Sequence, residues 1–112
     1  MKKSLIIFTF LLTFSYVNAQ ENKFAVKRAS NAISFISSEM DLTDKQTQFI
    51  EKTLYTKYAE NALKIKGNNL SQVEKKEVYS KAAAATRKLL RQEFSKEEVM
   101  SIIKLERQSF KK

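Results

Sequence analysis

Residues 43–67 read TDKQTQFIEKTLYTKYAENALKIKG, and this stretch decides the fold class. Its apolar side chains recur at spacings of three and four residues, at Ile50, Leu54, Tyr58, Ala62 and Ile65. That period is typical of one face of an α-helix. Thr43 and Gln46 have the spacing of a capping box, in which each side chain bonds the backbone N–H of the other residue. Gly67 is free to adopt the left-handed conformation that ends many helices. The stretch therefore predicts a helix over residues 44–66.

Two further capping boxes divide the rest of the chain. Ser71 and Glu74 have the required spacing, and so do Ser95 and Glu98, with Phe94 at the position of a hydrophobic staple. The predicted helices cover residues 22–38, 44–66, 72–92 and 96–108. In the third of them, Val78, Ala82, Ala85 and Leu89 are expected to share one face, flanked by Tyr79 and Leu90.

The composition agrees with an all-α fold. The chain has 112 residues with no Pro, no Cys and one Gly, so it has few of the residues that punctuate strands and tight turns. A short turn joins the two longest predicted helices. We therefore expect a long antiparallel helical hairpin with two shorter flanking helices, in a single domain. Because Cys is absent, helix packing alone must stabilise this domain.

The N-terminus has the order of a secretory signal peptide. Met1-Lys2-Lys3 is positively charged, the run from Leu5 to Val17 is apolar, and Ala19 supplies a small residue before the cleavage site. The apolar run is shorter than the roughly 20 residues of a membrane-spanning helix, which makes a retained anchor the lesser alternative. We predict a signal peptide over residues 1–19, a mature domain over residues 20–112, and a periplasmic or secreted location.

The residue types leave little catalytic chemistry. The chain has no His and no Cys, so the usual general base near neutral pH, the Cys nucleophile and most zinc and copper sites are missing. A single Gly provides no phosphate-binding loop. Glu97 and Glu98 are adjacent, but they lie in the first turn of a predicted helix, where negative charge favours the helix dipole. We expect no enzyme activity, no cofactor and no metal site.

A basic, partly apolar helical surface is the candidate binding site. The net charge is +9, and removal of residues 1–19, with two lysines and no acid, lowers it to +7. Such a charge attracts unfolded acidic segments or anionic lipid headgroups, whereas export argues against nucleic acid as the partner. The alternatives are a solvated face for the cations, and packing between helices or in a homodimer for the apolar residues. The candidate binding residues are Phe49, Leu63, Lys81, Arg87, Lys88 and Arg91.

Leu42-Thr43-Asp44-Lys45-Gln46 has the form LTxxQ and opens a long predicted helix. The chain resembles the Spy/CpxP family of periplasmic proteins, whose members carry this motif twice, at the starts of two helices. The second copy would be Phe94-Ser95-Lys96-Glu97-Glu98, 52 residues further on, where Phe, Ser and Glu replace Leu, Thr and Gln. The resemblance implies a homodimer of helical hairpins, shaped as a shallow basic cradle with apolar patches. Such a cradle binds unfolding exported proteins without ATP, or inhibits an envelope stress sensor.

Three functions are open at this point. The first is a chaperone-like or stress-response protein that holds unfolded exported proteins. The second is a dedicated regulator that inhibits an envelope sensor protein. The third is a cationic protein that binds anionic membrane surfaces through amphipathic helices. The motif pair, the export signal and the apolar, basic surface together favour the first.

Overall fold

The computed structural model describes residues 22–111, so the predicted signal peptide over residues 1–19 lies outside the described part of the chain. The described residues form four helices and no strand, which confirms an all-α fold with four helices. The helices are α2 (Lys23–Glu39), α3 (Asp44–Ile65), α4 (Gln72–Leu90) and α5 (Lys96–Ser109).

Side chains cap the start of every one of these helices. Helices α3, α4 and α5 each begin with a reciprocal capping box. The boxes pair Thr43 with Gln46, Ser71 with Glu74, and Ser95 with Glu98. Helix α2 has a simpler cap, in which the Asn22 side chain accepts a hydrogen bond from the Ala25 N–H at 3.0 Å. After α3, Gly67 has φ +76°, the left-handed conformation that an L side chain resists.

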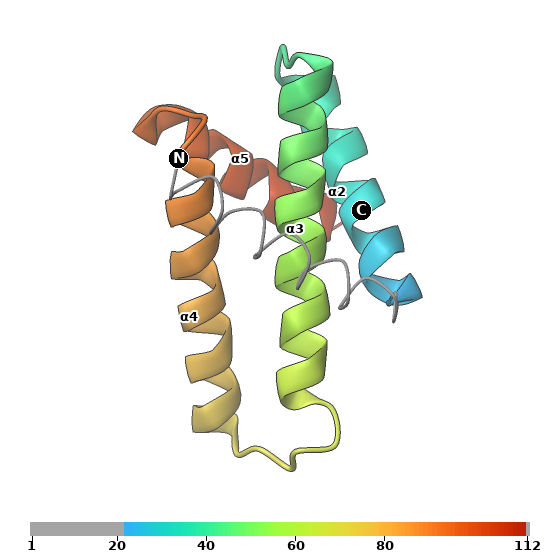
Figure 1. Ribbon diagram of the computed structural model, residues 1–112, viewed down its shortest axis with the longest axis vertical. Coiled ribbons are helices and arrows are strands. Elements are labelled where there is room, and N and C mark those ends of the chain that lie inside the picture. The colour runs from blue at the N-terminus through green and yellow to red at the C-terminus, as the bar shows by residue number, and fades with distance from the viewer. Residues whose placement is uncertain (1–21, 112) are drawn as a thin grey trace, which may run out of the picture.

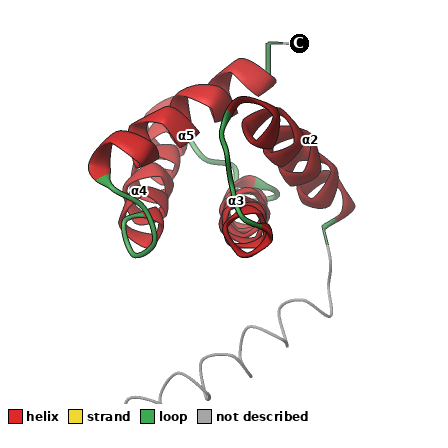
Figure 2. Ribbon diagram, turned by 90° about the horizontal axis from the view of Figure 1, so that it is seen from above, coloured by secondary structure: helices red, strands yellow, loops and turns green. Residues whose placement is uncertain are grey.

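The helices contact one another in a chain of neighbours. Helix α3 packs against α2 and against α4, and α2 also packs against α5. Figure 1 shows α3 and α4 side by side, with the connection over residues 66–71 at one end. Figure 2, seen nearly along these two helices, shows α5 running across from the α4 side towards α2. The C-terminal end of α5 therefore lies close to both α2 and α3.

The core lies where α2, α3 and α5 meet. Helix α2 brings a row of alanines to it, at Ala25, Ala29 and Ala32, and all three are at most 1% exposed. Small residues at this spacing let two helix backbones approach closely. Larger side chains fill the remaining space, and the fully buried ones are Ile36, Ile50, Leu54, Leu90 and Ile102.

Helix α4 is the least buried of the four helices. Only Thr86 and Leu90 of its 19 residues are buried. On the apolar face expected for this helix, Val78 and Ala82 are half-buried, whereas Ala85 is exposed and Leu89 is 40% exposed. Leu90 enters the core instead, and its carbonyl accepts the N–H of the equally buried Phe94 at 2.9 Å. The turn after α4 thus places the Leu90 side chain in the core and leaves the Leu89 side chain exposed.

Candidate functional site

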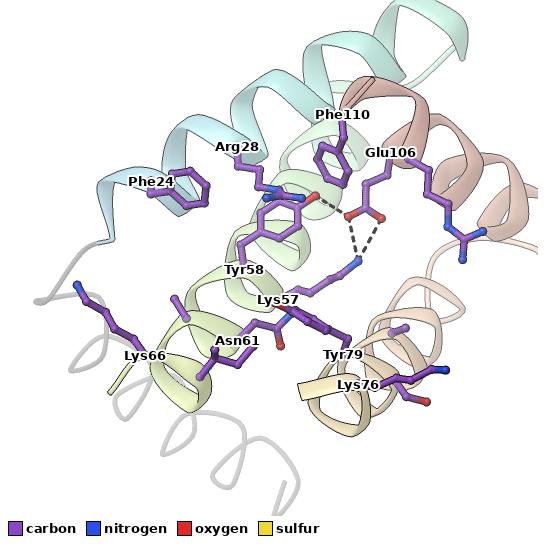
Figure 3. A pocket seen from close by; sticks show the side chains of 15 residues that line it. Phe24, Arg28, Lys57, Tyr58, Asn61, Lys66, Lys76, Tyr79, Glu106 and Phe110 are labelled. Carbon is purple, nitrogen blue, oxygen red and sulfur yellow. Dashed lines mark hydrogen bonds and ion pairs between the residues drawn. The ribbon is translucent and has the colours of Figure 1, made fainter. Parts of the chain in front are cut away.

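A buried charged cluster links α3 to α5. The Glu106 carboxylate is only 2% exposed, and it accepts hydrogen bonds from Lys57 Nζ at 2.9 and 3.2 Å. The Tyr58 hydroxyl donates a further hydrogen bond to the same carboxylate (Figure 3). A buried carboxylate is stable only when its oxygens are paired in this way. The three side chains therefore act as one unit that holds the end of α5 on α3.

The position of Glu106 follows from the sequence of α5. Val99 and Ile102 are buried at helical spacing, and Glu106 is the next residue on the same face. When α5 buries this apolar row, the carboxylate enters the interior with it. This role was not predicted from the sequence, although an acidic residue within an apolar row was the available signal.

Burial raises the pKa of the Tyr58 hydroxyl well above its usual range. The negative charge of Glu106 and the hydrogen bond to Glu106 raise the pKa further. The guanidinium of Arg28 opposes these effects. Tyr58 therefore stays protonated in the folded chain at pH values where an ordinary tyrosine loses its proton.

This difference predicts a loss of stability in alkali. Above a pH of about 10, the unfolded chain releases the Tyr58 proton and the folded chain keeps it. Because the unfolded state then binds fewer protons, the free energy of unfolding falls as the pH rises. Urea unfolding at several pH values should show this fall, and Tyr58→Phe should show a smaller one. Equal slopes for both proteins would contradict the role of Tyr58.

Arg28 of α2 lies among aromatic rings beside this cluster. Its guanidinium carbon is 4.0 Å from the centroid of the Phe110 ring and 5.1 Å from that of Tyr58. The Phe24 ring is 6.0 Å away. Contacts of this kind attract a cation to the ring faces and fix its position. Arg28 thereby joins α2 to the cluster between α3 and α5.

A groove of about 660 Å³ opens beside the cluster and is lined by all four helices (Figure 3). Its lining includes the aromatic rings of Phe24, Tyr58, Tyr79 and Phe110. Five cationic side chains line it against one carboxylate, that of Glu106. The groove is therefore both apolar and basic.

The exposed surface of α4 is a second basic and apolar region. The apolar side chain of Val73 is 75% exposed, and the Tyr79 ring is 52% exposed. The cations predicted for binding are all exposed: Lys81, Arg87 and Lys88 lie on α4, and Arg91 is its C-cap residue. Lys81 lies 3.5 Å from Glu77, and the other three make no ion pair within the described part of the chain. Their charge is therefore free to act on a partner.

The two predicted apolar residues of α3 have different surroundings. Phe49 is half-buried at the edge of the core, with its ring centroid 6.4 Å from that of Phe94. Leu63 is 66% exposed. Neither lines the groove, and the four α4 cations lie outside its lining as well. Leu42 of the LTxxQ motif is half-buried against the core, next to the cap that opens α3.

Together these features define a small helical protein with a basic, weakly buried helix and a basic aromatic groove. No family model, curated protein or solved structure matches the chain. Among the described residues, no helix is long and apolar enough to cross a membrane. The described residues also contain no group of three or more acidic side chains placed to hold a metal ion.

Proposed function

We propose that this chain is an exported, ATP-independent chaperone-like protein that holds unfolded polypeptides on the exposed surface of α4. One observation carries the proposal. A helix of 19 residues buries only Thr86 and Leu90, and it leaves cations and large apolar side chains in solvent. A helix with no partner role would be expected to bury more of its apolar side chains against its own domain.

The exposed residues suit weak binding of acidic clients. Three cations, at Arg87, Lys88 and Arg91, make no ion pair within residues 22–111 and would attract acidic segments over a distance. Exposed apolar side chains such as Val73 and Leu89 would then contact apolar residues of the client. Since each contact is small, affinity stays low, and a client that folds withdraws its apolar residues and leaves.

The proposal includes membership of the Spy/CpxP family. It is supported by the LTxxQ motif at Leu42–Gln46 and by the related motif at Phe94–Glu98, each at the start of a helix. With membership come an α3–α4 hairpin flanked by α2 and α5, a homodimer, and an export signal over residues 1–19 that directs the protein to the periplasm. Sedimentation equilibrium at tens of micromolar would test the dimer, since a monomer mass would contradict it.

A scattering experiment tests the holding function. A chemically denatured acidic protein is diluted into buffer with and without this protein, and aggregation is followed by light scattering. We expect suppression at a small molar excess, and weaker suppression for a basic client of similar size, because the cations on α4 repel it. Unchanged scattering of the acidic client at several-fold molar excess would reject the proposal. Equal suppression of both clients would reject the electrostatic part.

A further inference from the structure

A small cavity lies beside the groove, between α3, α4 and α5. Its volume is about 80 Å³. Lys57, Glu106 and Phe110 line both the cavity and the groove, so the two spaces adjoin. Helix α4 contributes Thr86 and Arg87 to the walls of the cavity. Because a water molecule occupies about 30 Å³ in the liquid, a space of this size holds one small ion or one functional group of a larger ligand.

Two arginines from different helices line this cavity. They are Arg87 of α4 and Arg107 of α5, and both side chains are exposed. Neither makes an ion pair within residues 22–111. An acid of the same helix pairs with a cation from three or four positions away, and at those positions both arginines have only apolar or basic neighbours. The two guanidinium groups therefore share one cavity without a counter-charge of their own.

The other two charged residues of the lining neutralise each other. The Glu106 carboxylate accepts hydrogen bonds from Lys57 Nζ at 2.9 and 3.2 Å, and Figure 3 shows the lysine directed at the carboxylate. The lining thus has three cations, those of Lys57, Arg87 and Arg107, against one carboxylate. Two positive charges are left in excess. An anion with two negative charges would neutralise them, whereas a single carboxylate would neutralise only one.

A phosphate monoester has the chemistry that this cavity requires. Each guanidinium presents N–H donors in a planar fork that matches two phosphate oxygens. The phosphate group carries close to two negative charges just above neutral pH. The organic group of the ester has room in the adjoining groove of about 660 Å³. Since the Phe110 ring lines both spaces, a ligand that extends from the cavity into the groove passes an aromatic wall.

We propose that Arg87 and Arg107 bind the phosphate group of an aromatic phosphate monoester, whose ring lies in the groove against Phe110. The bound phosphate joins α4 to α5, two helices that otherwise pack chiefly against α3 and α2, respectively. The site shares Arg87 with the polypeptide-binding surface proposed on α4, but it does not rest on that proposal, because Arg107 and the groove lie outside that surface.

Three small anions test the proposal by NMR titration of the backbone amides at pH 8, where a phosphate monoester carries close to two charges. Phenyl phosphate has the ring and both charges, phenyl sulfate has the same ring and one charge, and inorganic phosphate has no ring. We expect phenyl phosphate to bind about fivefold more tightly than phenyl sulfate, because the second charge adds about one exposed ion pair. It should shift the amides around Arg87, Arg107 and Phe110.

The same titrations contain the results that would overturn the proposal. Equal affinities for phenyl phosphate and phenyl sulfate would contradict a site for two charges. Shifts confined to residues away from the cavity would contradict its location. Inorganic phosphate should bind more weakly than phenyl phosphate because it leaves the groove empty. Equal binding of these two would overturn the placement of the ring in the groove and identify free phosphate as the ligand.

Charge variants separate this site from general attraction to a basic protein. Arg87→Gln/Arg107→Gln should weaken phenyl phosphate about tenfold, because two ion pairs of this exposure are worth about a tenfold change together. The control Arg91→Gln/Lys104→Gln removes the same charge from the C-cap of α4 and from α5, at exposed residues outside the cavity, and should leave the affinity unchanged. Equal losses in both variants would show attraction by net charge only and overturn the proposal. A failure of client holding leaves these titrations unaffected, so the two proposals fail separately.

Discussion

Replacement of Glu106 by Gln is expected to lower the free energy of unfolding by about 3 kcal/mol, because it leaves the partly buried Lys57 ammonium without its counter-charge. Gln keeps the shape of the side chain and can still accept the Tyr58 hydrogen bond. The fall in the free energy of unfolding therefore measures the loss of the ion pair and not the creation of a cavity. Urea unfolding followed by circular dichroism measures it.

Two further variants show whether the lost free energy of unfolding comes from the buried ion pair. Glu60→Gln removes the same charge from an exposed position of α3 and should change the free energy of unfolding by less than about 0.5 kcal/mol. The double variant Lys57→Met/Glu106→Gln should recover part of the loss, because it removes both charges from the interior. A Glu106→Gln protein as stable as the Glu60→Gln protein would show that the buried cluster does not hold α5 on α3.

Replacement of Leu54 by Ala is expected to destabilise the fold by about 3 kcal/mol, since it creates a cavity at the centre of the core. Leu54 is 0% exposed and lies on α3, which packs against both α2 and α4. Domains of ordinary stability have about 5–15 kcal/mol in total, and a chain with so few large buried residues is expected near the lower end. The melting temperature should therefore fall markedly.

Leu63→Ala is the matched control for this variant, because it makes the same truncation on the same helix at a residue that is 66% exposed. It should leave the free energy of unfolding nearly unchanged. Similar losses for the two variants would mean that Leu63 is covered in solution, for example by a second copy of the chain.

Local sequence signals predicted the helices well. The hydroxyl residues Thr43, Ser71 and Ser95 each precede a helix by one residue, because a cap is a bond between near neighbours and needs no tertiary contact. The same holds for Gly67, whose left-handed backbone follows α3. Fold class was accordingly predictable from residues that act within one turn of the chain.

Contacts between distant residues were harder to predict. Lys57 and Glu106 are 49 residues apart, and nothing in either local pattern pairs them. Arg28 lies over the Phe110 ring, near the other end of the chain, and no local pattern pairs these two residues. The burial of Leu90 in place of Leu89 depended on the turn that leads into α5. Each of these outcomes is decided by how helices meet, which periodicity along one helix does not specify.

The low burial of α4 connects this fold to the function proposed for it. Helices α2, α3 and α5 share the core with one another, whereas α4 contacts chiefly α3. The capping box at Ser71 and Glu74 helps to keep α4 helical without much packing, and hydrogen bonds from Ser71 hold the pKa of the Glu74 carboxyl below its usual value. A stable helix with a free basic surface is what a binding surface for unfolded acidic segments requires.

The most direct test of that claim is the affinity of α4 for an acidic protein kept unfolded by reduction and carboxymethylation, measured by fluorescence anisotropy. The variant Arg87→Gln/Lys88→Gln/Arg91→Gln removes three free cations from α4 and its C-cap. The control Lys45→Gln/Lys64→Gln/Lys104→Gln removes three exposed cations from α3 and α5. We predict that the α4 variant binds about tenfold more weakly than the control, and that its affinity depends less on salt concentration. Equal affinities for the two variants would contradict it.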